Sequence, residues 1–239
     1  MPRTIAIGDV HGCASEFEAL LSILKPQPED RIIQVGDLVN RGPNSHDAVS
    51  LAREYKVSCL LGNHELRLLK AREDPFTNEL KNYDLETLNQ LTESDWDFLK
   101  TFSNYLHFTE QNTVFVHAGF LPTPAWYHQA IETITEIQVV DADGHAARSA
   151  DAPNAVSWVD VWPGSPFVVY GHTPRPKVCK RPGSIGIDTG CVYGGYLTAY
   201  IVQDKTIVQV PARKAYVRKN SMKKIVSSRL KSASLNSSS

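Results

Sequence analysis

The chain has 239 residues, of which 42% are hydrophobic and 21% charged, and its formal net charge is −1. This length and composition predict one large globular domain and exclude a chain that is disordered throughout. No stretch approaches 18 apolar residues and no apolar leader follows a charged start, so we expect a cytoplasmic protein without a membrane segment. The four cysteines show no paired C-x-x-C spacing, which favours reduced, buried thiols.

Charge is distributed unevenly along the chain. From Pro211 onward there are eight Lys or Arg and no acidic residue, whereas the rest of the chain holds 17 basic and 26 acidic residues. The acidic body is typical of a chain that gathers carboxylates around metals. The basic end is Ser-rich and has no apolar periodicity, so we predict a catalytic domain over 1–212 and a disordered tail over 213–239. The alternative role of the tail is weak contact with a polyanion.

The first 72 residues alternate between apolar runs and amphipathic segments. Short apolar runs at 4–8, 31–35 and 57–61 predict buried strands. The segments 15–24, 44–55 and 64–72 are expected to be helices, and Ser15 with Glu18 indicates a capping box in the first. This alternation predicts an α/β fold with parallel strands, in which sites lie at the carboxyl ends of the strands.

Later segments have less regular patterns. Residues 75–104 are polar with apolar positions at helical spacing, which predicts one or two helices beside the site, capped at Thr92 or Ser94. Residues 126–137 are expected to be helical, and 141–154 to form a loop. Further strands are predicted at 113–116 and 167–170. Strands of a second sheet are predicted at 184–187, 197–202 and 206–210, with a turn at 203–205.

Five short polar motifs each follow a predicted strand or apolar run. In chain order they read GDVHG at 8–12, GDLVNRG at 36–42, GNHE at 62–65, HAG at 117–119 and GHT at 171–173. Each alone would suit a turn or a helix cap. Together they carry six side chains of metal-ligand type, which are Asp9, His11, Asp37, Asn63, His117 and His172. Mixed oxygen and nitrogen ligands favour manganese, iron or zinc over calcium.

A pair of divalent metals predicts phosphoryl-transfer chemistry. Two metals lower the pKa of a bridging water, and the resulting hydroxide attacks phosphorus in line. His64 follows Asn63 and is placed to protonate the leaving oxygen. Arg41 offers a planar fork for phosphate oxygens. Arg67, one helical turn after His64, is either a second substrate-binding residue or an exposed helix arginine.

These motifs resemble those of the calcineurin-like metallophosphoesterases, and within them the phosphoprotein-phosphatase group, over roughly residues 4–202. The resemblance implies two mixed β-sheets in a four-layer αββα sandwich, with the site at the sheet edges. It implies two divalent metals, of which Mn²⁺ is expected, with Asp9 and His11 on the first, Asn63, His117 and His172 on the second, and Asp37 bridging both. It also implies that His64 is the catalytic histidine and that Arg41 binds phosphate.

Two positions depart from the pattern of the protein phosphatases. Those enzymes carry an aspartate before the arginine of the second motif, where it hydrogen-bonds the catalytic histidine, whereas this chain has Asn40. An asparagine cannot stabilise an imidazolium as a carboxylate does, so we expect the acid role of His64 to be weaker or supported by other residues. Eukaryotic members also add a second phosphate-binding arginine, for which Arg175 is the candidate here.

The segments GDLVNRGP at 36–43 and IDTGCVYGGYLTA at 187–199 are similar to those of symmetrical diadenosine tetraphosphatases and their bacterial relatives. They favour hydrolysis of a nucleoside or dinucleoside polyphosphate and place Asp188 behind a ligand or in a turn. A phosphoprotein Ser/Thr phosphatase is the alternative, followed by an enzyme for nucleic-acid ends or polyphosphate. A binding protein without turnover is disfavoured, because every ligand type is retained. A dinucleotide substrate predicts aromatic stacking near the metals, with the candidates Trp126, Tyr127, Trp158, Trp162 and Tyr193.

Overall fold

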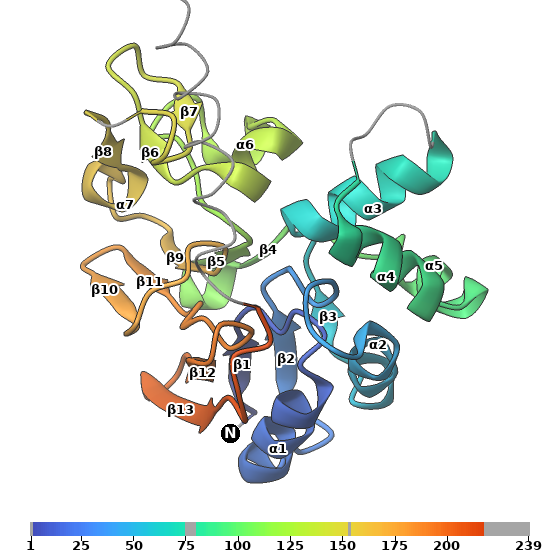
Figure 1. The fold of residues 1–239 in the computed structure, drawn as a ribbon. Coiled ribbons are helices and arrows are strands. Elements are labelled where there is room, and N and C mark those ends of the chain that lie inside the picture. The colour runs from blue at the N-terminus through green and yellow to red at the C-terminus, as the bar shows by residue number, and fades with distance from the viewer. Residues whose placement is uncertain (1, 75–79, 153, 218–239) are drawn as a thin grey trace, which may run out of the picture.

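The computed structural model describes residues 2–74, 80–152 and 154–217. Two five-stranded mixed sheets form the centre of the molecule, and a three-stranded sheet lies apart from them (Figure 1). The fold is therefore mixed α/β, as predicted. None of the helices within the described residues is both long enough and apolar enough to cross a bilayer.

The first sheet has the order β13-β12-β1-β2-β3. Its strands are β1 (Thr4–Ile7), β2 (Arg31–Gln34), β3 (Ser58–Cys59), β12 (Tyr196–Ile201) and β13 (Thr206–Pro211). The pairs β1–β2 and β2–β3 are parallel, as the alternating pattern predicted, while the hairpin β12–β13 joins β1 in antiparallel fashion. The prediction that β12 and β13 belong to the second sheet is wrong, because strand pairing across the length of the chain leaves no local signal.

The second sheet has the order β10-β11-β9-β5-β4. Its strands are β4 (Tyr105–Phe108), β5 (Thr113–Val116), β9 (Phe167–Tyr170), β10 (Cys179–Arg181) and β11 (Ser184–Gly186). The predicted strands β5, β9 and β11 are confirmed and run parallel to one another, whereas the antiparallel edge strands β4 and β10 were not predicted. Both are half-buried or exposed along most of their length, so their apolar signal is weak.

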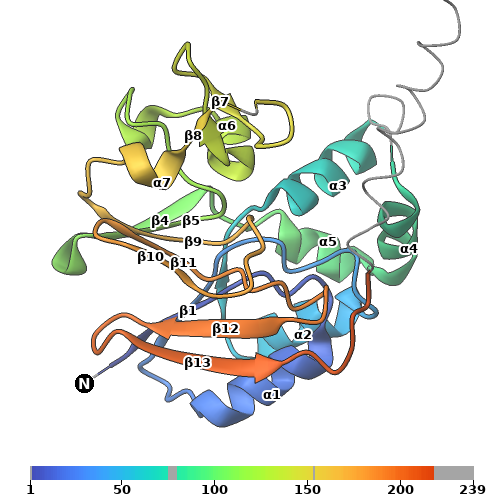
Figure 2. The ribbon, with the colours of Figure 1, turned by 60° about the vertical axis from the view of Figure 1, so that its left-hand side comes forward.

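The two sheets stack face to face with helices outside them (Figure 2). Between them lies a buried apolar layer that consists of Ala6, Ile33, Val35, Leu60, Phe115, Val169, Ile185, Ile187 and Tyr200. The outer face of the first sheet packs on α1 (Ala14–Leu24) and α2 (Ser45–Glu54). The predicted Ser15–Glu18 capping box is wrong. The helix begins at Ala14 after Cys13, so Ser15 lies inside its first turn and no side chain caps it.

Three further helices stand beside the sheets at one end of the first sheet (Figures 1 and 2). They are α3 (Asn63–Glu73), α4 (Asn82–Gln90) and α5 (Glu93–Leu99). The second and third confirm the helices predicted within 75–104, of which residues 75–79 lie outside the described residues. The predicted cap at Thr92 is confirmed, because its side chain accepts a hydrogen bond from the backbone N–H of Asp95.

A compact unit covers the outer face of the second sheet. It contains α6 (Ile131–Glu136), α7 (Trp158–Val161) and a small sheet of β6 (Val139–Val140), β7 (Ala146–Ala147) and β8 (Val156–Ser157). The single helix predicted at 126–137 is wrong in its first part, which is a 3₁₀ turn at Trp126–His128. The loop predicted at 141–154 contains β7, whose two alanines give no strand signal.

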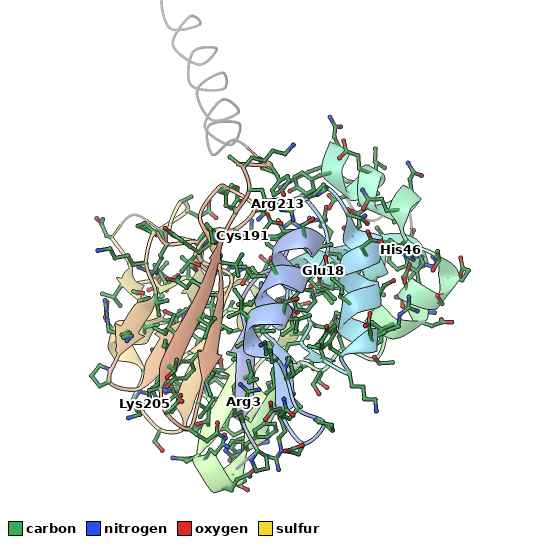
Figure 3. The ribbon with its side chains drawn as sticks, turned by 90° about the horizontal axis from the view of Figure 1, so that it is seen from below. Arg3, Glu18, His46, Cys191, Lys205 and Arg213 are labelled. Carbon is green, nitrogen blue, oxygen red and sulfur yellow. The ribbon has the colours of Figure 1, made fainter. Side chains whose placement is uncertain are left out.

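The end of the described chain packs against the body rather than leaving it at residue 212. The backbone N–H of Arg213 and the hydroxyl of Tyr216 both donate to the buried carboxylate of Glu16 at 2.9 Å. Figure 3 shows Arg213 near the end of α1 that carries Glu16, with Cys191 nearby. The predicted domain boundary therefore precedes the last packed residues, and most of the predicted basic tail, residues 218–239, lies outside the described residues.

Candidate metal centre

The predicted ligand residues all lie just beyond strand ends. Asp9 follows β1, Asp37 follows β2, Asn63 begins α3 shortly after β3, His117 follows β5 and His172 follows β9. Because β1, β2 and β3 are parallel, as are β5 and β9, each set of strands delivers its loops to one edge of its sheet. The two edges meet, so residues that are far apart in the sequence share one site.

Hydrogen bonds to backbone carbonyls fix the proton positions of two histidines. His117 Nδ1 lies 3.0 Å from the carbonyl oxygen of Val35, and His172 Nε2 lies 3.1 Å from that of Glu136. A carbonyl oxygen only accepts, so each of these nitrogens carries the hydrogen. In the neutral rings, His117 Nε2 and His172 Nδ1 therefore present lone pairs.

These lone pairs converge with oxygen atoms of two other predicted ligands. His117 Nε2 and His172 Nδ1 are 3.2 Å apart, and each lies 3.2 Å from Asn63 Oδ1. The carboxylate of Asp37 lies 3.5 Å from His117 Nε2. The asparagine oxygen and the carboxylate offer only acceptors to the two unprotonated nitrogens, so a cation would satisfy atoms that otherwise repel one another.

A second group shares Asp37. His11 Nε2 lies 3.5 Å from the other oxygen of Asp37, while its Nδ1 lies 3.3 Å from the carbonyl oxygen of Val39. His64 lies in the same cluster with His11 and Asp37. Both oxygens of Asp9 accept from the backbone N–H of His172 at 3.1 Å, which fastens the end of β1 to the end of β9.

The electrostatics of the cluster suit bound cations. Burial, with the charges of Asp188 and Asp37, raises the pKa of Asp9, and burial raises the pKa of Asp37 to about 6. Burial also lowers the pKa of His117 to about 3, so its ring is neutral and ready to ligate. Buried carboxylates held against neutral imidazoles fit a divalent metal centre.

Two glycines provide the space that these carboxylates occupy. A Cβ on Gly62 would lie 2.2 Å from Asp37 Oδ1, and a Cβ on Gly171 would lie 2.1 Å from Asp9 Oδ1. Any other residue at either position would displace the carboxylate. The glycines of the third and fifth motifs are therefore part of the site, although they offer no ligand atom.

Glu65 is a site residue that the sequence analysis missed. Its fully buried carboxylate accepts from the backbone N–H groups of Asp37, Val39 and Gly62 at 2.9–3.0 Å. Burial and the charge of Asp37 raise its pKa to about 8. Glu65 thus ties the loop after β2 to the start of α3. The signal was its place in the GNHE motif, directly after the predicted catalytic histidine.

Arg41 lies beside the cluster, near two aromatic rings. Its Nη1 is 3.1 Å from His11 Nε2, and its guanidinium carbon lies 5.8 Å from the ring centroids of both Tyr83 and Tyr193. Its Nε is buried without a hydrogen-bond partner among the described residues. Of the aromatic candidates, Tyr193 lies near the cluster, whereas Trp158 is buried in the core outside the second sheet. Tyr83 was not among them.

His64 is supported by an arginine. Arg67 Nη2 lies 3.0 Å from His64 Nδ1, and the same guanidinium pairs with Asp84, with Nη2 2.7 Å from Oδ1. Asn40 donates to Asp84 at 2.5 Å. Burial alone would raise the pKa of Asp84, but hydrogen bonds from Arg67, from the backbone of Lys81 and from Asn40 lower it. Asn40 therefore reaches the histidine only through Asp84 and Arg67.

The two remaining predicted site residues, Asp188 and Arg175, are joined by a backbone hydrogen bond. Asp188 accepts from the backbone N–H of Gly190 at 2.9 Å and, through its charge, raises the pKa of Asp9. The backbone N–H of Arg175 donates to the carbonyl oxygen of Asp188 at 3.1 Å. The positive charge of Arg175 opposes the increase that burial causes in the pKa of Tyr170. The proposed contact of Arg175 with substrate stays a prediction.

Left-handed backbone conformations are concentrated at the site. His11, Asp37, Asn40, Arg41 and His172 have φ between +49° and +79°. Asn, Asp and His tolerate this region better than other residues with a Cβ. These conformations turn the chain sharply after each strand and direct the side chains toward the cluster.

Comparison with known proteins places the chain among phosphoesterases. The family model described as calcineurin-like phosphoesterase matches residues 2–184. The chain is 30% identical to the asymmetrical bis(5'-nucleosyl)-tetraphosphatase PrpE of Oceanobacillus iheyensis, with 88% of this chain and 93% of that protein covered. It is 26% identical to the symmetrical bis(5'-nucleosyl)-tetraphosphatase of Methylobacillus flagellatus, with 89% and 96% covered.

Solved structures agree with this result. A crystal structure described as that of a "putative diadenosine tetraphosphatase" is 29% identical and covers 89% of this chain and 96% of its own, with a TM-score of 0.79. A serine/threonine phosphatase of Saccharomyces cerevisiae has a TM-score of 0.58 at 13% identity, with 92% of this chain and 82% of that chain covered. The latter shares the fold.

Proposed function

Because this chain belongs to the calcineurin-like phosphoesterase family, we propose that it is a phosphohydrolase that uses two divalent metals to cleave a dinucleoside polyphosphate such as diadenosine tetraphosphate. Relatives named as asymmetrical and as symmetrical tetraphosphatases both match it, at 30% and 26% identity, so the products of the reaction are needed to identify which bond is cut.

The observation that carries this proposal is the pair of ligand groups that meet at Asp37. One group gathers Asn63, His117 and His172 around one oxygen of Asp37, and the other places His11 near its second oxygen. Asp9 is joined to this site because its carboxylate accepts a hydrogen bond from the backbone N–H of His172. This set of oxygen and nitrogen donors can hold Mn²⁺, Fe, Zn, Co or Ni, and the family resemblance makes Mn²⁺ the expected metal.

When bound, two such cations would activate water and neutralise charge on the phosphate. The chain itself positions the substrate around them. Arg41 lies next to His11, and its buried Nε has no partner among the described residues, so its guanidinium can pair with phosphate oxygens of a substrate at the metals. His64, whose buried Nε2 has no hydrogen-bond partner in the part of the chain that the structure describes, offers a hydrogen bond to the leaving oxygen.

Two features beside the metal centre suit the nucleoside ends of a dinucleotide. Tyr83 and Tyr193 flank Arg41 and provide aromatic surface for a base near the phosphate-binding group. On the other side, a cavity of about 460 Å³ lies between α6 and β7, and its wall includes Glu136, whose carbonyl contacts His172. Carboxylates in its wall, among them Glu132 and Asp151, can accept hydrogen bonds from ribose hydroxyls or an adenine amino group.

The test is a side-by-side assay with the Mn²⁺-loaded protein. Diadenosine tetraphosphate and a phosphoserine or phosphothreonine peptide are incubated separately, and the nucleotide products are resolved by ion-exchange chromatography. We expect turnover of the dinucleotide, with ADP alone for symmetrical cleavage or ATP and AMP for asymmetrical cleavage.

The D37N variant serves as the control, because it keeps the side-chain volume and removes the charge shared by both ligand groups. Phosphate release from the peptide, with the dinucleotide untouched, would overturn the proposed substrate in favour of a phosphoprotein phosphatase. Equal turnover by wild type and D37N would overturn the proposed metal centre.

A further inference from the structure

His64 is held by hydrogen bonds that define which of its nitrogens carries a proton. Its ring is fully buried at the start of α3, and Nδ1 lies 3.0 Å from Nη2 of Arg67. A guanidinium is always protonated and can only donate. His64 Nδ1 must therefore accept, which places the single hydrogen of the neutral ring on Nε2.

Asp84 holds Arg67 in the orientation that this contact requires. Both oxygens of the carboxylate accept from Arg67, with Nε at 3.2 Å from each and Nη2 at 2.7 Å from Oδ1. Asp84 is itself fully buried, and it also accepts from Asn40 Nδ2 at 2.5 Å and from the backbone N–H of Lys81 at 2.8 Å. The start of α4 thus sets the position of a guanidinium on α3.

The other nitrogen of His64 is available to substrate. Nε2 is buried and has no hydrogen-bond partner among the described residues. It belongs to the cluster with His11 and Asp37, and the ring of Tyr83 lies 5.7 Å from the His64 ring. A buried N–H without an acceptor is unfavourable, so this position is suited to an oxygen of the bound substrate.

We propose that Arg67 and Asp84 are positioning residues that fix the tautomer of His64, with its hydrogen on Nε2, and thereby restrict the enzyme to leaving groups that are stable as anions. This inference rests on the proposed phosphohydrolase function. The P–O bond to the leaving oxygen breaks with its electron pair on that oxygen, and water forms the new P–O bond and releases its proton to solvent. His64 keeps its hydrogen throughout and stabilises the developing charge.

This arrangement separates two classes of substrate. The leaving group of a phosphoanhydride is a nucleotide phosphate, and the second pKa of a phosphate ester is about 6, so it departs as an anion without a proton. A serine or threonine alkoxide is strongly basic and needs a proton from a general acid. A histidine whose Nδ1 faces a carboxylate can carry a hydrogen on that nitrogen as well and supply the proton, whereas Nδ1 of His64 accepts from Arg67 and holds no hydrogen in this geometry. The contact therefore favours phosphoanhydrides over phosphoprotein esters.

The first test reads the position of the hydrogen directly. Imidazole ¹⁵N NMR of the protein loaded with diamagnetic Zn²⁺ should show His64 with a protonated Nε2 and an unprotonated Nδ1. In the R67A variant the two nitrogen signals should move toward each other as the tautomers mix. R72A is the matched control, because Arg72 lies on the same helix and pairs with Glu93, and it should leave the His64 signals unchanged. A protonated Nδ1 in the wild type would overturn the proposal.

The second test uses a series of aryl and alkyl phosphate esters, so it does not depend on the dinucleotide being a substrate. In the wild type, kcat should fall steeply as the pKa of the leaving group rises. The R67E variant replaces the donor with an acceptor, and it should raise the alkyl-to-aryl rate ratio by about 10²-fold, the typical contribution of a general acid. R67Q, which adds no charge beside Asp84, should change the ratio in the same direction if R67E does not fold. A flat series in the wild type, or an unchanged ratio in a folded R67E or R67Q, would refute the role of Arg67.

Discussion

Removal of the metals should make the stability of this protein fall as the pH rises above neutral. The cause is Glu65, whose carboxyl is fully buried and whose pKa is raised to about 8 by burial and by Asp37. In the unfolded chain a glutamate titrates near its usual value, about 4.3. Between these two values the folded state binds one proton more than the unfolded state, so stability decreases with rising pH and levels off above about 8.

The buried histidines limit the pH range in which this decrease in stability can be measured. Burial lowers the pKa values of His11, His64, His117 and His172, so these residues are neutral in the folded state. Below their unfolded pKa, about 6.5, the unfolded chain binds more protons than the folded state, so the histidines add stability as the pH rises toward that value. Below that value their rising contribution opposes the decline caused by Glu65. Above it they are neutral in both states, and the carboxyls alone determine the slope.

The expected loss follows from the width of that window. One proton corresponds to about 1.4 kcal/mol per pH unit, so Glu65 alone should lower the free energy of unfolding by about 2 kcal/mol between pH 6.5 and pH 8, and Asp9, whose pKa is also raised, acts in the same direction. Urea unfolding of the EDTA-treated protein across this range measures it. Saturating Mn²⁺ should remove the slope, since a cation beside Asp37 favours the ionised carboxyls, and E65Q should flatten it. A metal-free stability that stays constant or rises from pH 6.5 to pH 8 would refute the reasoning.

Four further predictions concern two single positions and two truncations. D37N should lose turnover and retain cooperative thermal unfolding, because the asparagine can still accept the N–H of His64 at 3.1 Å; wild-type kcat in this variant would contradict the bridging role. Y83A should raise KM for diadenosine tetraphosphate about tenfold, since stacking of a base on an aromatic ring contributes about 1–3 kcal/mol, and leave KM for 4-nitrophenyl phosphate unchanged; equal effects on both would exclude base stacking. Truncation after Val217 should leave turnover of small substrates unchanged and, if the tail binds polyanions, weaken only polyphosphate substrates. Truncation after Val210 should also cost about 1–3 kcal/mol of stability, because it leaves Glu16 without its partners.

Local signals in the sequence were sufficient for the strands that deliver the candidate ligands. The strands before Asp9, Asp37, His117 and His172 are short apolar runs that end in polar motifs, and the structure has a strand at each place. The parallel arrangement follows from the helices between them. The structure therefore brings the predicted ligand residues together at the expected strand ends.

Long-range contacts account for what the sequence did not reveal. The pairing of β12 with β1 brings Tyr200 opposite Ala6, and no property of either segment indicates it. The support of His64 is similar. Asn40 indicated that the usual carboxylate was missing, but its replacement comes from Arg67 on α3 and Asp84 on α4, and no local pattern joins these two helices.

The left-handed backbone at His11, Asp37, Asn40, Arg41 and His172 has a consequence for how this protein could be stabilised. Each such conformation costs a residue with a Cβ up to roughly 1–2 kcal/mol, and less for Asn, Asp and His, so glycine would relieve backbone strain at these positions. Glycine would also remove the side chain on which the proposed chemistry depends. Selection for thermal stability alone should therefore substitute these five residues early. A library scored only by melting temperature should accumulate folded, inactive variants at these positions.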